Sequence, residues 1–247
     1  MMKTLRILLL LSLVASSACQ SAEDEKVYVG SVGNQRILLP TPKGFVSVET
    51  IPKLYAGSEA VTPPSHRFIN AFYEKDRVEA WLNGKPLDID RYFIIQTERQ
   101  EEEKTMTVSE FSRLKLALNK AIIEKTKKEQ PPSSMDLKDQ RDVKNNISQL
   151  QKRYKLQPFD FRLGNTIILG KTEEQENYLS TASVTKNIFK FGNKSEEVLM
   201  ASVSTILLAK GKLINIYGYC KYSREEDLTW LQDMSKTIAS KTSSVNQ

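Results

Sequence analysis

Histidine and cysteine are nearly absent from this sequence. Its 247 residues contain one histidine, His66, and two cysteines, Cys19 and Cys220. A zinc site usually takes three or four Cys or His ligands, and these residues are scattered along the chain. The composition therefore disfavours zinc, and we expect no metal and no other cofactor.

The single histidine follows a Pro-Pro-Ser turn, where an exposed loop residue is the simplest interpretation of His66. Histidine can move protons near neutral pH, so a hydrolase built on His66 remains open as an alternative. No Gly-x-Ser-x-Gly nucleophile elbow accompanies it. We therefore predict that the protein is not an enzyme.

The motifs for phosphate and calcium are incomplete. Residues 170–172 (Gly-Lys-Thr) match the end of a phosphate loop, but Asn165 stands where its first glycine is required. Residues 88–90 (Asp-Ile-Asp) lack the glycine and the later glutamate of a calcium loop, and we interpret them as a polar entry to a strand. The sequence therefore predicts no bound nucleotide.

The N-terminus has the three parts of a secretory signal. A basic start over residues 1–6 precedes an apolar run over 7–14 and a small-residue stretch over 15–18. The apolar run is much shorter than the about 20 residues that span a bilayer. We therefore predict a signal peptide over 1–18 and an exported protein in a bacterial envelope, periplasmic or lipid-anchored.

Two fates of Cys19 remain open. Residues 16–19 (Ser-Ser-Ala-Cys) resemble the bacterial lipoprotein motif, whose cysteine is lipidated, but Ser16 stands where that family prefers Leu, Val or Ile. Lipidation of Cys19 would anchor the protein to a membrane and leave Cys220 alone. Plain secretion would allow a disulfide between the two cysteines. Our expectation for Cys220 itself is a small, buried residue on a strand.

The length suits one large domain or two small ones. Removal of residues 1–18 leaves 229 of the 247 residues. We predict a polar tether over 19–26, a single domain over 27–243 with a basic helical insert at about 107–156, and a disordered tail over 244–247.

Short stretches rich in β-branched and aromatic residues predict strands. They fall at 27–32, 35–39, 45–48, 68–73, 92–98, 166–170, 179–189, 198–209 and 213–222. Residues 210–212 (Lys-Gly-Lys) predict a hairpin turn between the last two.

Helices are predicted by two capping boxes and by apolar residues at helical spacing. The boxes lie at 107–110 (Thr-Val-Ser-Glu) and 223–226 (Ser-Arg-Glu-Glu), and a further helix is expected at about 136–154. Hairpins with helices packed on them give an α+β fold, an antiparallel β-sheet flanked by amphipathic helices. A strand, a capping box and a helix occur at 92–128 and again at 213–242, which fits either an internal duplication into two similar β-rich halves or a common unit used twice.

This order of elements resembles the PsbP-like fold, an antiparallel sheet flanked by helices. The resembling pieces are Leu39-Pro40-x-Pro42-x-Gly44-Phe45 and Glu226-Asp227-x-x-Trp230-Leu231. The mature chain also looks like an uncharacterised family of exported proteobacterial proteins, through the strand start Asp90-Arg91-Tyr92-Phe93 and the helix start Glu226-Asp227-x-x-Trp230. Neither resemblance implies catalytic residues, and the basic insert departs from the PsbP-like pattern.

Basic residues are concentrated between Arg113 and Lys155, where 12 Lys or Arg face 5 Asp or Glu. One interpretation is a solvated helical hairpin. The other is an arm that docks on anionic lipid headgroups or on an acidic partner. The contact residues would then be Lys120, Lys125, Lys127, Lys128, Lys152 and Arg153. Nucleic acid is not expected, because the arm lacks aromatic residues between Phe111 and Tyr154.

Together these features predict an exported envelope protein that is a non-enzymatic binding or accessory module with an envelope partner. The alternatives are a lipid-anchored or membrane-surface protein that uses the basic helices, and an unrecognised hydrolase.

Overall fold

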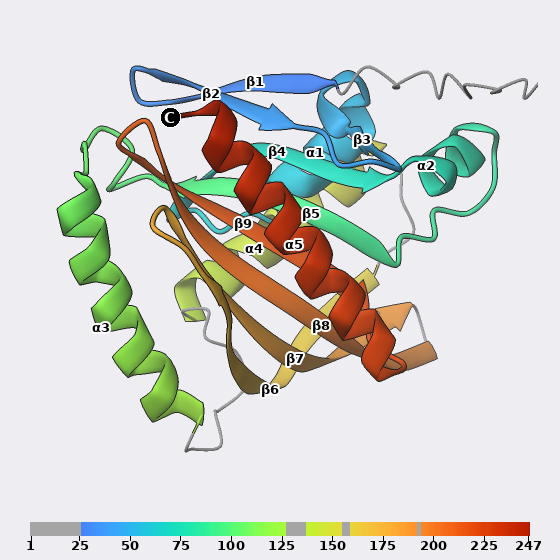
Figure 1. The fold of residues 1–247 in the computed structure, drawn as a ribbon. Helices are drawn as coiled ribbons and strands as arrows, with labels where there is room; N and C mark the ends of the chain where they lie inside the picture. Colours follow the sequence, from blue (N-terminus) through green and yellow to red (C-terminus); the bar gives the residue numbers. More distant parts are fainter. Residues whose placement is uncertain (1–25, 127–136, 155–158, 192–193) are drawn as a thin grey trace, which may run out of the picture.

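The computed structural model describes residues 26–126, 137–154, 159–191 and 194–247 (Figure 1). The expected α+β class is confirmed, with helices packed on an antiparallel sheet. The strands are β1 (Val27–Val32), β2 (Gln35–Pro40), β3 (Phe45–Ser47), β4 (His66–Glu74), β5 (Arg91–Glu98), β6 (Phe159–Glu174), β7 (Tyr178–Phe191), β8 (Lys194–Ala209) and β9 (Lys212–Lys221). The helices are α1 (Pro52–Ala60), α2 (Lys75–Leu82), α3 (Val108–Thr126), α4 (Leu137–Tyr154) and α5 (Glu225–Val245), with a short 3-10 turn η1 (Val48–Thr50).

The main sheet has seven strands in the order β3-β4-β5-β9-β8-β7-β6, and β1 and β2 form a separate hairpin. Strands β8 and β9 are joined by a tight turn. Between β8 and β9 the turn uses the left-handed conformation, with φ of 49° at Lys210 and 76° at Gly211, and confirms the predicted hairpin.

One face of the main sheet is covered by α5, which crosses β8 and β9 and ends beside β2 (Figure 1). Alternate residues of the strands point into this layer because side chains alternate along a strand. Phe93, Ile216 and Leu231 are fully or almost fully buried there, and Ile37 adds the β1–β2 hairpin to the same core.

The opposite face carries a second core. Here α1 packs on β4, α4 packs on α1, and α2 follows directly after β4. Tyr73, Tyr92 and Tyr219 stack across three neighbouring strands, with ring centroids 5.6 and 4.9 Å apart. The stack continues the core between the helices and the centre of the sheet.

The outer edge of the sheet is β6, which pairs with β7 alone in the described strand order. Its register shifts three times, between Leu163 and Thr166, Ile168 and Gly170, and Lys171 and Glu173. Such irregularities twist a strand locally. They also explain why the sequence predicted only 166–170, since they interrupt the alternation on which strand prediction depends.

The first capping box is confirmed at the start of α3. The Glu110 carboxylate accepts from the Thr107 N–H at 2.8 Å, and the Glu110 N–H donates to the Thr107 hydroxyl at 3.2 Å. The acidic residue of the second capping box lies one position later than predicted. Asp227, not Glu226, accepts the N–H groups of Ser223 and Arg224, at 3.0 and 3.1 Å.

The predicted disordered tail over 244–247 is wrong. Helix α5 continues to Val245, and Asn246 is 2% exposed because its side chain pairs with the backbone of β2.

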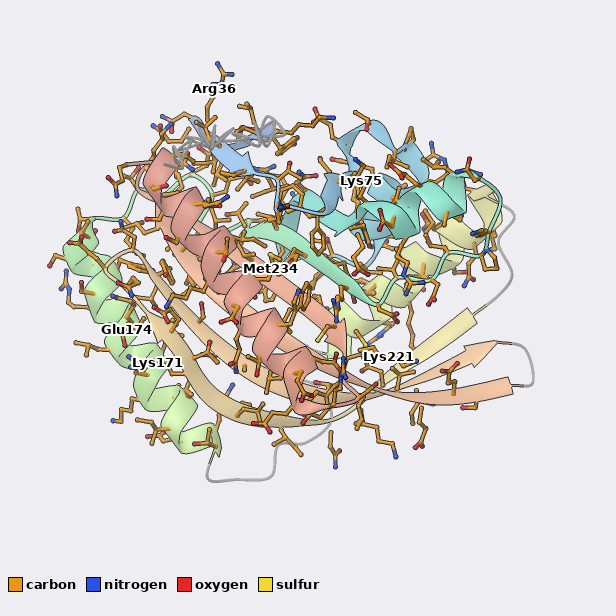
Figure 2. All side chains as sticks on the ribbon, turned by 45° about the vertical axis from the view of Figure 1, so that its right-hand side comes forward. Arg36, Lys75, Lys171, Glu174, Lys221 and Met234 are labelled. Carbon is orange, nitrogen blue, oxygen red and sulfur yellow. The ribbon has the colours of Figure 1, made fainter. Side chains whose placement is uncertain are left out.

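The two basic helices exist, but they do not form a hairpin. In α3, Asn119 donates to the Glu174 carboxylate of β6 at 3.2 Å and the Lys115 ammonium donates to the Gln175 carbonyl. Figure 2 shows Glu174 and Lys171 beside α3. By contrast, α4 packs on α1, behind the sheet in Figure 1. The units β5–α3 and β9–α5 therefore share their order but not their packing, since α5 lies on the face of the sheet and α3 at its β6 edge.

Candidate ligand pocket

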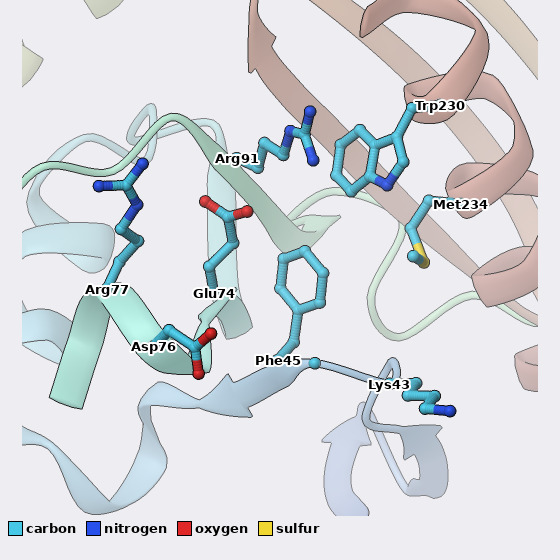
Figure 3. Close-up of a pocket in the computed structure, with 9 residues that line it drawn as sticks. Lys43, Phe45, Glu74, Asp76, Arg77, Arg91, Trp230 and Met234 are labelled. Carbon is cyan, nitrogen blue, oxygen red and sulfur yellow. The ribbon is translucent and has the colours of Figure 1, made fainter.

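A pocket of about 270 Å³ opens to solvent where α5 passes the starts of β3 and β5 (Figure 3). Four segments that are distant in the sequence supply its walls. The lining residues are Lys43, Gly44, Phe45, Glu74, Asp76, Arg77, Arg91, Trp230 and Met234.

One wall of the pocket is aromatic. Phe45 and Trp230 stack with ring centroids 6.3 Å apart at 19°, and Phe93 meets both rings, edge-on to Phe45 at 5.5 Å. Gly44 makes the preceding turn with a φ of 82°, a conformation that favours glycine and brings Phe45 into the start of β3. Trp230 and Met234 follow each other at i, i+4, so one side of α5 presents both to the pocket.

Arg91 lies over the indole ring of Trp230. Its guanidinium carbon is 4.2 Å from the centre of the indole ring, a cation–π contact. Its Nη2 is 3.7 Å from Asp227 Oδ1, while the other oxygen of Asp227 accepts the two N–H groups that begin α5. These hydrogen bonds, first that from Ser223, lower the pKa of Asp227. The cation–π contact and the ion pair together hold Arg91 beside Trp230.

Glu74 is the half-buried acid of the pocket. Burial raises the pKa of its carboxyl group, against the opposing effect of the positive charges of Arg91 and Arg77. Arg77 itself pairs with Asp88 at 3.3 Å and Asp90 at 3.5 Å. Asp88 and Asp90, which precede β5, therefore hold Arg77 beside the pocket. Two carboxylates and three cations line the pocket beside the aromatic wall, an arrangement that can hold a small charged organic molecule.

The residues predicted to contact an anionic surface are not brought together. Lys120 and Lys125 lie exposed on α3, at the β6 edge, whereas Lys152 and Arg153 lie exposed on α4, the helix that packs on α1. Cys19, Lys127 and Lys128 lie outside the described residues. None of the four described residues lines the pocket.

His66 is the first residue of β4 and is half-buried, not a loop residue as expected. Its Nδ1 lies 3.0 Å from the hydroxyl of the adjacent Ser65. Within the described part of the chain, no cluster of three or more His, Cys, Asp or Glu residues has a geometry that could hold a metal ion.

Cys220 has the predicted position. It is fully buried on β9, and its thiol donates to the carbonyl of Asp227 at 3.4 Å. Burial raises the pKa of this thiol to about 11.

The pocket itself was missed by the sequence analysis, although its signals were present. Phe45 ends the first piece of the PsbP-like resemblance, Arg91 belongs to the strand-start motif, and Trp230 to the helix-start motif. The fold places these three segments in mutual contact. Their separation by 46 and 139 residues conceals this contact in the sequence.

No protein-family model matches this chain, and no curated protein matches it significantly. Among the described residues, no helix has the length and hydropathy needed to cross a membrane.

Proposed function

We propose that this chain is an exported protein of the bacterial envelope that works as a non-enzymatic binding module. The observation that carries the proposal is the pocket, in which Arg91 lies on Trp230 beside the half-buried Glu74. Binding pockets combine apolar walls with placed polar groups, and this one sets an aromatic wall and Met234 beside five charged side chains. The signal-like residues 1–18 support export.

Binding is tested by thermal unfolding of the purified protein with a panel of amino acids, small carboxylic acids and amines. We expect at least one class to raise the melting temperature, and Met234→Lys to abolish the effect. Met234 is partly exposed, so a lysine there can reach solvent while placing a charge in the pocket. Lys53→Glu, on the exposed side of α1, is the control. A panel without effect, or an effect that survives Met234→Lys, contradicts the proposal.

Export is tested separately by the mass of the mature N-terminus after expression in a Gram-negative host. Cleavage before Cys19 supports export, and a diacylglyceryl group on Cys19 identifies the lipid-anchored form. An intact N-terminus in the cytoplasm contradicts it.

A membrane-surface role is the second candidate, and one surface of α3 favours it. Leu116 is 69% exposed and Ile123 is 55% exposed, and the exposed Lys120 stands between them. The spacing i, i+4, i+7 places the three side chains on one side of the helix. Apolar residues beside a cation suit an anionic lipid surface.

This candidate is tested by co-sedimentation with phosphatidylglycerol vesicles and with phosphatidylcholine vesicles. We expect binding to the anionic vesicles that the double change Leu116→Ser and Lys120→Glu removes, and that Lys53→Glu leaves in place. Equal binding of all variants would exclude the α3 surface.

A further inference from the structure

The pocket offers both signs of charge at one end, and this limits the ligand. Figure 3 shows the side chains of Arg91 and Glu74 directed to the same end of the pocket, with Trp230, Phe45 and Met234 alongside. A ligand with a carboxylate alone would face Glu74, and a ligand with an amine alone would face Arg91. A molecule that carries a carboxylate and an ammonium group on one carbon offers a partner to each residue.

Arg91 has the donors to hold a carboxylate. A guanidinium group carries five N–H donors. Among the described carboxylates, Asp227 alone lies within ion-pair distance of Arg91, at 3.7 Å, and it is already bonded to the start of α5. The guanidinium carbon lies 4.2 Å from the centre of the Trp230 ring, and a guanidinium group can meet a carboxylate through two parallel hydrogen bonds.

Glu74 can pair with the ammonium group of a ligand. Its carboxylate is half-buried, and its burial outweighs the positive charges of Arg91 and Arg77 in setting its pKa above the ordinary value. A further positive charge placed in the pocket would offset this desolvation. Asp76, in the first turn of α2, adds a second negative charge to the same lining.

The size and the apolar wall define the rest of the ligand. A volume of about 270 Å³ lies just below the roughly 300–1,000 Å³ of pockets for drug-sized molecules. Phe45, Trp230 and the flexible Met234 offer a surface for one aromatic or aliphatic group.

We propose that the pocket binds a free α-amino acid with an apolar side chain, its carboxylate on Arg91, its ammonium beside Glu74 and its side chain against Trp230 and Met234. This inference rests on the proposed binding function and names its ligand class.

The test compares phenylalanine with phenylpropionate, which lacks the ammonium, and phenethylamine, which lacks the carboxylate, by isothermal titration calorimetry. We expect phenylalanine to bind at least about tenfold more tightly than either analogue, because each analogue leaves one half-buried charge of the pocket without its partner. Leucine and methionine are expected to bind in the same range as phenylalanine.

Two variants assign each charge to its residue. With Glu74→Gln, phenylalanine should bind no more tightly than phenylpropionate, but still more tightly than phenethylamine. With Arg91→Gln, phenylalanine should bind no more tightly than phenethylamine, but still more tightly than phenylpropionate. Such a cycle between ligand and protein isolates each contact from any general loss of stability.

The outcomes separate this inference from the proposed function. Equal binding of phenylalanine and phenylpropionate, or a preference that Glu74→Gln leaves unchanged, overturns the amino-acid assignment while the pocket remains a binding site. Absence of binding by all these ligands and by the wider panel overturns both. A peptide with a free N-terminus that binds as tightly as phenylalanine also overturns the assignment, since its carboxylate is remote from its ammonium.

Discussion

The side chain of Asn246 pairs with the backbone of Leu38 as a neighbouring strand would. The Leu38 N–H donates to Asn246 Oδ1 at 2.9 Å, and Asn246 Nδ2 donates to the Leu38 carbonyl at 2.7 Å. The same nitrogen donates to the Thr242 carbonyl, so it also closes the last turn of α5. Asn246, which follows α5, thereby fastens the β1–β2 hairpin to the helix.

Asn246→Ala should lower the free energy of unfolding by about 1–3 kcal/mol, because it leaves buried backbone groups without partners. Denaturant unfolding measures the loss, and amide hydrogen exchange at Leu38 should accelerate. Deletion of the exposed Gln247 is the control and should change neither. Unchanged exchange at Leu38 in the alanine variant would show that the pairing does not secure the hairpin.

Gly218 of β9 lies where a larger residue cannot fit. A Cβ atom there would be 2.6 Å from Phe93 Cε1 and 3.0 Å from Leu231 Cδ1. Gly218→Ala should therefore destabilise the protein by about 1–3 kcal/mol through overpacking. Gly57→Ala in α1 is the matched control, because no atom lies within 4 Å of its added Cβ, and it should stabilise by up to about 1 kcal/mol. Chemical denaturation distinguishes the two signs.

We expect the free energy of unfolding to depend on pH because of the carboxyl group of Glu102. Its Oε1 accepts from Arg67 at 2.7–2.8 Å, and this hydrogen bond is the main reason that its pKa is lowered. A carboxyl group whose pKa is lower in the folded state stabilises the fold above its unfolded pKa, and this stability is lost as the pH falls through the folded value.

Glu102→Gln should therefore destabilise the protein at pH 7 by at most about 1 kcal/mol, since solvent screens the pair. The difference from wild type should shrink below about pH 4. Urea unfolding at pH 7, 5 and 3 measures it, with the exposed Glu103→Gln as control. A difference that stays constant across this range would exclude the Arg67 pair as its source.

Cys220 should react slowly with thiol reagents. Its side chain is fully buried, and burial raises the pKa of the thiol to about 11, so little thiolate exists at pH 8. Iodoacetamide followed by peptide mapping should label Cys220 in urea and leave it unlabelled in the folded protein. The same map, without reductant, should show no Cys19–Cys220 disulfide, because the buried thiol is already bonded to the Asp227 carbonyl. Rapid labelling without urea would show that this part of β9 opens readily.

Helices and strands could be predicted from the sequence where a capping motif or a regular spacing of apolar residues marks them. The Thr107 capping box follows from local backbone needs and is confirmed, and the helix that it was predicted to open is α3. The short helices α1 and α2 were missed because they have few turns and little apolar periodicity. The α5 box moved from Glu226 to Asp227 because two carboxylates stand side by side in the sequence, and only the three-dimensional turn selects between them.

The pocket could not be predicted from local patterns. Phe45, Arg91 and Trp230 carry no shared motif, and their meeting depends on which strands are neighbours and where α5 crosses them. The basic stretch shows the opposite case. Its charges are adjacent in sequence, yet α3 and α4 pack on different elements and separate Lys120 from Lys152.

The irregular edge of β6 has a consequence for how copies of this chain meet. An incoming strand needs an even row of backbone donors and acceptors, and the three register shifts divide the 16-residue β6 into short pieces. A second chain could therefore match only a few residues at a time. The β6 edge is thus a poor template for strand-by-strand growth, and the protein should stay monodisperse at concentrations where a straight edge of that length would seed aggregates.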